Sequence, residues 1–177
     1  MWCKTKNLKE MKKIALIMAI AALLVSCGTT SGVTSGMSKA EHNAYVAEQV
    51  YNNLNDRHYT IEVNYMTPRR GGMRSVSGGY ELTVKGDTVD SYLPYFGDVY
   101  RANPYSQQKG LHFTSTIYNY TAAMVKQGEY RIQFQTETDE DRYLYTIDVF
   151  ENGKSYIDVY AQDRDGIAFS GEMKIAY

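Results

Sequence analysis

Residues 143–160 read YLYTIDVFENGKSYIDVY, and they contain the clearest fold signal in the chain. Residues 143–150 and 155–160 are rich in tyrosine, isoleucine and valine, which favour β-strands. Between the two runs stands Asn152-Gly153, the strongest two-residue hairpin signal, because both residues tolerate positive φ. We therefore expect two antiparallel strands joined by a tight turn.

Similar strand signals lie on both sides of this hairpin. Apolar and polar residues alternate in residues 59–65, 130–135 and 167–175, which places the apolar side chains on one face of each strand. Residues 80–84 and 111–120 complete a set of at least seven strands, and Gly86-Asp87 and Asp165-Gly166 mark further turns. Short consecutive strands with no helical pattern between them predict an antiparallel sheet that curls into a barrel or a sandwich.

One helix is expected before the strands. Ser38 and Glu41 fit a capping box, in which each side chain accepts a hydrogen bond from a backbone N–H of the other residue. An apolar stripe along about 17 residues follows, and Asn55-Asp56 marks the expected end. The stripe consists of Ala40, Ala44, Ala47, Tyr51 and Leu54, with Val50 alongside. The fold class is therefore α+β and mainly β, with an N-terminal helix followed by the antiparallel sheet.

The N-terminus has the layout of a secretory signal. Met11-Lys12-Lys13 precedes an apolar run at residues 14–25, which is too short to span a bilayer. Leu24-Val25-Ser26-Cys27 resembles the lipobox of bacterial lipoproteins, in which a diacylglycerol thioether forms on the cysteine before cleavage. We therefore expect a signal peptide at residues 1–26, with Met11 as the true start, and a membrane anchor through lipid on Cys27. An ordinary cleaved signal with a chance cysteine is the alternative.

The remaining chain is expected to form a tether and one domain. Residues 28–36 are small and polar, so residues 27–37 are interpreted as a flexible lipid-anchored tether and residues 38–177 as a single globular domain. Cleavage would remove five of the 19 Lys and Arg residues and one of the 20 Asp and Glu residues, leaving a net charge near −5. This charge disfavours nucleic acid as a partner. The two cysteines are Cys3 and Cys27, so the domain is expected to be stable without a disulfide.

No residue pattern predicts catalysis, a metal site or a cofactor. The three histidines lack the spacing of metal ligands, and no serine lies in the Gly-x-Ser-x-Gly pattern of hydrolases. Residues 139–141 and 163–166 are acidic, but neither continues into a calcium-binding loop, and both are interpreted as solvated turns. Arg69-Arg70 with Arg74 is interpreted as a solvated turn, and the glycine-rich residues 71–79 as a mobile loop.

The most distinctive segment is residues 90–97, which read DSYLPYFG and follow an expected strand end. Proline cannot donate to a sheet ladder, so Leu93-Pro94 is expected to leave the sheet and run along an edge or rim. In one interpretation, Leu93 and Phe96 plug one end of the core. In the other, Tyr92 and Tyr95 face outward as an aromatic platform for a protein or glycan. Tyr92, Tyr95 and Phe96 are therefore the candidate binding residues.

These motifs carry a family resemblance. Tyr-Leu-Pro-Tyr-Phe-Gly at residues 92–97, the later Gly-x-x-Phe at residues 110–113 and the Asn152-Gly153 hairpin resemble the Bacteroidota lipoprotein family catalogued as domain of unknown function 4251. The resemblance covers roughly residues 48–177. It implies an envelope lipoprotein and carries over no catalytic residue, because the family has no established activity.

The sequence as a whole favours a non-enzymatic periplasmic binding or interaction module. In the Bacteroidota lipoproteins that the chain resembles, surface export is associated with acidic residues directly after the acylated cysteine. Residues 28–30 include none, so the resemblance implies a place on the outer membrane facing the periplasm. The expected partners are the membrane, through the lipid, and an envelope protein or glycan. An envelope glycan hydrolase and a lipocalin-like carrier of a small apolar ligand remain as alternatives. A clustered acid, base and nucleophile would favour the hydrolase, and a large apolar cavity would favour the carrier.

Overall fold

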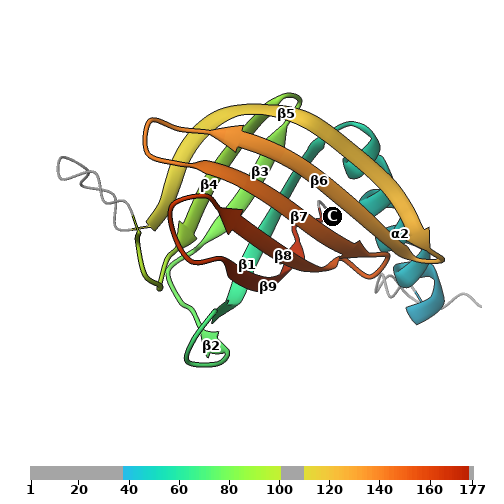
Figure 1. The fold of residues 1–177 in the computed structure, drawn as a ribbon. Helices are drawn as coiled ribbons and strands as arrows, with labels where there is room; N and C mark the ends of the chain where they lie inside the picture. The colour runs from blue at the N-terminus through green and yellow to red at the C-terminus, as the bar shows by residue number, and fades with distance from the viewer. Residues whose placement is uncertain (1–37, 101–109, 176–177) are drawn as a thin grey trace, which may run out of the picture. The chain divides into compact units, whose positions relative to one another are not determined.

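A computed structural model describes residues 38–100 and 110–175 of the 177-residue chain (Figure 1). The chain divides into two units, Met1–Gly36 and Met37–Tyr177, and all described residues belong to the second unit. The expected signal peptide and tether lie outside the described residues, so the domain boundaries stay predictions. The described part of the chain contains no helix with the length and apolar character needed to cross a membrane.

Helix α2 (Lys39–Asn55) begins as the sequence predicted. The Ser38 hydroxyl oxygen accepts a hydrogen bond from the Glu41 backbone N–H at 3.2 Å, and Glu41 Oε2 accepts one from the Ser38 N–H at 2.8 Å. The capping box is therefore confirmed. The helix ends at Asn55, and Asp56 forms the C-cap.

The buried face of α2 differs from the predicted stripe. The buried residues are Val46, Val50 and Leu54, which recur every fourth residue, whereas Tyr51 is 55% exposed. Of the alanines, Ala40 and Ala44 are also exposed. Leu54 and the flanking Val50 were placed correctly, and Ala47 is half-buried. The larger valine side chains bury more apolar area than alanine and therefore set the orientation of the helix.

Nine β-strands lie within the described residues, and neighbouring strands are antiparallel. They are β1 (His58–Pro68), β2 (Arg74–Ser75), β3 (Glu81–Lys85), β4 (Thr88–Pro94), β5 (Gly110–Lys126), β6 (Glu129–Glu137), β7 (Arg142–Phe150), β8 (Lys154–Ala161) and β9 (Ile167–Met173). All seven predicted strands are present. Strand β4 was not in the predicted set, and β2 lies inside the segment that was interpreted as a loop.

Eight of the strands close a barrel. The order runs from β1 through β3 to β9, and β1 also pairs with β9, with Ile61 opposite Met173. The short β2 lies outside this ring and pairs with β1. A side chain at Gly171 would collide with the backbone carbonyl of Glu62, so glycine allows β9 to approach β1 closely. The mainly β fold is thus confirmed, and of the two predicted architectures the structure has the barrel.

Side chains fill the barrel interior. Alternate residues of β8 are buried along its whole length, as expected for a strand with one face on the core. The rings of Phe134 and Tyr145 stack at the centre with centroids 5.0 Å apart. The largest side chains with less than 2% of their surface exposed are Tyr59, Tyr145, Phe134, Phe169, Ile61, Leu82, Leu93, Leu111, Ile132, Ile147, Ile157 and Val50. These side chains therefore pack against one another and against the backbone in the barrel interior.

The two ends of the barrel are built from different segments (Figure 1). At the end that we call the helix end, α2 lies beside the β3–β4, β5–β6 and β7–β8 turns, and the Glu151 N–H donates to the Gly128 carbonyl. At the opposite end, the rim end, the β8–β9 loop contacts both the residues after β4 and the β6–β7 turn. The Asp165 N–H donates to the Asp98 carbonyl there, at 2.9 Å.

Candidate functional site

Strand β4 delivers the distinctive aromatic segment to the rim end. Leu93 pairs with Leu111 and is fully buried, and Pro94 pairs with Gly110 as the last residue of the strand. The prediction that Leu93-Pro94 leaves the sheet is therefore wrong. Proline is tolerated because it ends the strand. Gly110 is required opposite, since a side chain there would lie 2.9 Å from the Leu93 carbonyl oxygen.

The residues after Pro94 are fixed to the β8–β9 loop by backbone hydrogen bonds. The Tyr100 N–H donates to the Asp163 carbonyl at 2.7 Å, and Val99 forms an antiparallel bridge with Arg164. The Tyr95 hydroxyl lies 3.0 Å from the Asp98 carbonyl oxygen and 3.1 Å from that of Asp165. Burial raises the pKa of Tyr95 to about 12, so the hydroxyl stays a neutral donor near neutral pH.

A buried carboxylate organises the β6–β7 turn and the β8–β9 loop together. Asp141 Oδ1 accepts hydrogen bonds from the backbone N–H groups of Arg142 at 2.8 Å, Gln162 at 3.0 Å and Asp163 at 3.1 Å. Its Oδ2 accepts a hydrogen bond from Arg164 Nε at 3.1 Å. The interpretation of residues 139–141 and 163–166 as solvated turns is therefore wrong for Asp141, Arg164 and Asp165, which are all buried.

Arg164 links this carboxylate to the aromatic residues. Its side chain is only 8% exposed, and Nη2 lies 3.4 Å from Glu140 Oε2. The guanidinium carbon lies 5.4 Å from the ring centroid of Tyr95 and 5.7 Å from that of Tyr143, within cation–π range. One arginine therefore holds two acidic residues and two rings in a fixed arrangement.

Asp165 supplies a second buried carboxylate. It accepts hydrogen bonds from the Tyr100 hydroxyl, from Arg69 Nη1 at 3.4 Å and from the Asp98 N–H at 3.3 Å. The Tyr100 hydrogen bond is the main cause that lowers the pKa of Asp165, with Asp98 and Arg69 adding to it. Asp165 is thus an ionised structural acceptor near neutral pH.

Phe96 is exposed at the rim and contacts the arginine cluster. The ring is 49% exposed, and the Arg74 guanidinium carbon lies 4.3 Å from its centroid. Arg70 Nη1 lies 3.2 Å from Asp98 Oδ2. The interpretation of Phe96 as a core plug is therefore wrong, whereas Leu93 does lie in the core. The arginines are exposed as expected, but they also tie the β1–β2 turn to the segment after β4.

These groups surround a hollow of about 390 Å³ at the rim end. Its described lining consists of Arg70, Tyr95, Phe96, Gly97, Asp98, Val99, Gly110, Arg164 and Asp165. Two aromatic rings and an apolar valine lie beside guanidinium, carboxylate and backbone groups. This mixture of an apolar surface with a few oriented polar groups is typical of a binding site.

The structure brings together two of the three predicted binding residues. Tyr95 and Phe96 both line the hollow. Tyr92 lies on the outer face of the barrel, 43% exposed, with its ring centroid 5.3 Å from that of Tyr80 and 4.4 Å from that of His112. Cys27, the predicted lipid attachment site, lies outside the described residues.

The polar groups in the described lining of the hollow are arginine, aspartate, tyrosine and backbone groups. Its described lining contains no serine, cysteine, histidine or lysine. Asp98 is paired with Arg70, and Asp165 accepts three hydrogen bonds. Within residues 38–100 and 110–175, no three histidine, aspartate or glutamate side chains converge to hold a metal ion.

Comparison with known proteins supports the predicted family. The model of the family described as "Domain of unknown function (DUF4251)" matches residues 41–173. A crystal structure of a DUF4251 family protein from Bacteroides eggerthii has a TM-score of 0.57 and 11% sequence identity, over 72% of this chain and 86% of that chain. At this identity the likeness concerns the fold alone. No curated protein matches the chain.

Proposed function

Since this chain belongs to the DUF4251 family, whose description assigns no activity, we propose on physical grounds that it is a non-enzymatic binding module of the bacterial cell envelope. The observation that carries this proposal is the rim hollow, where Tyr95 and Phe96 lie beside a fixed polar frame. Ordered aromatic rings with neighbouring hydrogen-bonding groups suit the recognition of a protein or glycan.

The polar groups around Tyr95 and Phe96 support binding because they are already ordered by contacts within the described chain. Arg164 packs against Tyr95, Arg74 packs against Phe96, and the Tyr95 hydroxyl is hydrogen-bonded to backbone carbonyls. A partner would lose little side-chain entropy in ordering these groups, which favours affinity. Phe96 remains exposed and can contact a partner directly.

Both alternatives find less support. A carrier needs a large apolar cavity, whereas the largest side chains of the barrel interior are almost completely buried against one another. A hydrolase needs an acid, a base or a nucleophile in reach of a substrate, whereas the carboxylates at the hollow accept hydrogen bonds from arginine, tyrosine and backbone groups.

The proposal is tested by photo-crosslinking in the native envelope. Phe96 is replaced by a photoreactive phenylalanine analogue in the full chain, and crosslinked products are identified by mass spectrometry. The matched control carries the analogue at Tyr51, which is 55% exposed on α2 at the helix end. We expect a discrete adduct, protein or glycan, at position 96 and not at position 51. Absence of an adduct at position 96, or equal adducts at both positions, would contradict the proposal.

We also propose that the module is held on the outer membrane, facing the periplasm, through lipid on Cys27. Replacement Cys27→Ser is expected to abolish incorporation of labelled fatty acid and to release the protein from the membrane fraction, because lipid anchoring supplies the membrane affinity. Cys3→Ser is the control and should leave both measurements unchanged. Continued labelling of the Cys27→Ser protein would rule out this anchor.

A further inference from the structure

Strand β5 is longer than its neighbour β4. The β4–β5 pairing runs from Pro94 opposite Gly110 to Thr88 opposite Thr116, and the Ile117 N–H then donates to the Asp87 carbonyl at 2.8 Å. Beyond this point β5 continues to Lys126 and pairs with β6 on its other side. Residues 118–126 therefore present one backbone edge without a strand partner among the described residues.

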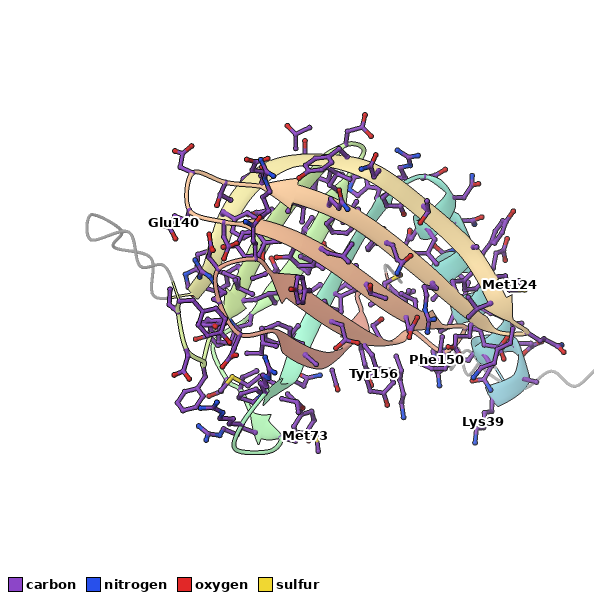
Figure 2. All side chains as sticks on the ribbon, in the orientation of Figure 1. Lys39, Met73, Met124, Glu140, Phe150 and Tyr156 are labelled. Atoms are coloured by element: carbon purple, nitrogen blue, oxygen red, sulfur yellow. The ribbon has the colours of Figure 1, made fainter. Side chains whose placement is uncertain are left out.

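This edge carries exposed apolar side chains. Residues 121–126 are all exposed, and four consecutive members, Ala122, Ala123, Met124 and Val125, are apolar. Met124 is 58% exposed and Val125 is 47% exposed. Figure 2 labels Met124 near the end of β5, at the opposite end of the barrel from Glu140. Such a run on a protein surface is unfavourable in water unless a partner covers it.

The edge lacks two of the features by which proteins protect free strands. Charged residues and proline usually prevent pairing with another chain. Residues 118–125 contain neither, and Lys126 at the end is engaged with Glu129 at 2.6 Å. The β5–β6 register is irregular between Tyr118 and Thr121, where Asn119 has a φ of 54°, and again between Met124 and Lys126. Between these two irregularities, residues 121–124 pair with β6 in continuous register.

We propose that this edge pairs with the same edge of a second copy of the chain, antiparallel about a twofold axis. In antiparallel self-pairing about a twofold axis, the numbers of two opposite residues always add up to twice the number of the residue on the axis. Opposite residues therefore differ by an even number of positions and lie on the same face of the strand. Pairing centred on Ala122, for example, sets Tyr120 opposite Met124, a favourable sulfur–aromatic contact. The uncharged segment 118–125 meets its copy without like-charge repulsion.

The size of the edge predicts a weak dimer. About eight residues of one strand bury less than the roughly 1,200 Å² typical of stable interfaces. Copies held on one membrane would meet at a high effective concentration, which favours such a contact. The measurement is therefore best made in cells that express the full chain. It does not depend on the rim hollow, which lies at the other end of the barrel.

The test is disulfide crosslinking under mild oxidation. Single cysteines are introduced at Thr121, Ala122, Ala123 and Met124, and in a matched control at Tyr160, which is 66% exposed on β8. The parent chain reports any background from Cys3 and Cys27, and residues 38–177 contain no other cysteine. We expect a disulfide dimer several-fold above both controls at the position on the twofold axis, with less at the positions beside it.

A second variant separates edge pairing from random collision. Ala123→Lys, added to whichever of the cysteine variants at positions 121, 122 and 124 crosslinks most, introduces two like charges at the paired edges and should abolish the dimer. Tyr160→Lys in the same background should leave it unchanged. Crosslinking equal to the Tyr160 control at all edge positions, insensitivity to Ala123→Lys, or a crosslink to a different protein in place of the dimer would each overturn the proposal.

Discussion

At the helix end, apolar residues of α2 pack against the buried core, whereas at the rim end two buried carboxylates and a buried arginine hold the loops together. Val46, Val50 and Leu54 need only apolar neighbours of suitable volume. Asp141 and Arg164 need every one of their hydrogen bonds, because a buried charge without partners is costly. The rim end therefore has one permitted arrangement, and it is also where Tyr95 and Phe96 lie.

The difference indicates why a candidate binding site lies at one end and not at the other. Apolar packing tolerates small shifts of a helix, so it positions a surface group loosely. A network of directed hydrogen bonds fixes the angles as well as the distances of the groups that it joins. The hydrogen-bond network at the rim end thus holds the rings of Tyr95 and Phe96 in place before a partner binds.

The largest expected effect is at the polar end. Replacement Asp141→Ala should lower the free energy of unfolding by about 3–5 kcal/mol, because it leaves the buried Arg164 and three backbone N–H groups without their acceptor. Urea unfolding followed by circular dichroism measures this loss. Glu137→Ala, which breaks an exposed pair with Arg142, is the control and should cost about 0–1 kcal/mol. Equal losses in the two variants would mean that the network does not hold the rim.

At the apolar end, Leu54→Ala should cost about 2–5 kcal/mol, because it removes buried volume where α2 meets the core. Tyr51→Ala on the exposed face of the same helix should change stability by no more than about 0.5 kcal/mol. A second measurement separates the two ends: the yield of photo-crosslinked adducts at position 96 in each destabilised variant. We expect Leu54→Ala to leave them intact and Asp141→Ala to remove them, and the reverse pattern would contradict the division between the ends.

The smallest expected effect is on the free energy of unfolding at acidic pH. The pKa of Asp165 is lowered by its hydrogen bond from Tyr100, so its folded-state pKa lies below the unfolded value near 3.8. The stabilisation is therefore present above about pH 4 and is lost as the pH falls through the folded-state pKa. Asp165→Asn should flatten the dependence of unfolding free energy on pH in this acidic range. An unchanged slope in the variant would show that ionisation of Asp165 does not contribute to the pH dependence of the unfolding free energy.

Local signals predicted much of the fold. The Asn152-Gly153 hairpin and the Ser38–Glu41 capping box depend on residues that are neighbours in sequence, and both are present. The helix face was misjudged because alanine fits both a core and a surface. Pro94 was taken as a strand breaker, although its position as the last residue of β4 removes the conflict.

The candidate site was predicted only in part. Tyr95 and Phe96 were singled out because aromatic residues cluster there in the sequence. The buried role of Asp141 and Arg164 could not be read from their segments, since each looks like an ordinary polar turn. They become buried only when the two loops meet in the folded barrel. The local signal that could have indicated burial is the arginine between two aspartates at residues 163–165, because charged side chains are buried only when they are paired.

The pairing of β1 with β9 has a consequence for the order of folding. Ile61 lies near the start of the domain and its partner Met173 near the end, so the barrel cannot close until almost the whole domain has been synthesised. Contacts between residues so distant in sequence form slowly, because the intervening chain must first lose its freedom. Until β9 is in place, the edge of β1 that will pair with it has no strand partner from the barrel. The same edge can then accept a strand of another chain, so late closure of the barrel is also the stage of folding most exposed to aggregation.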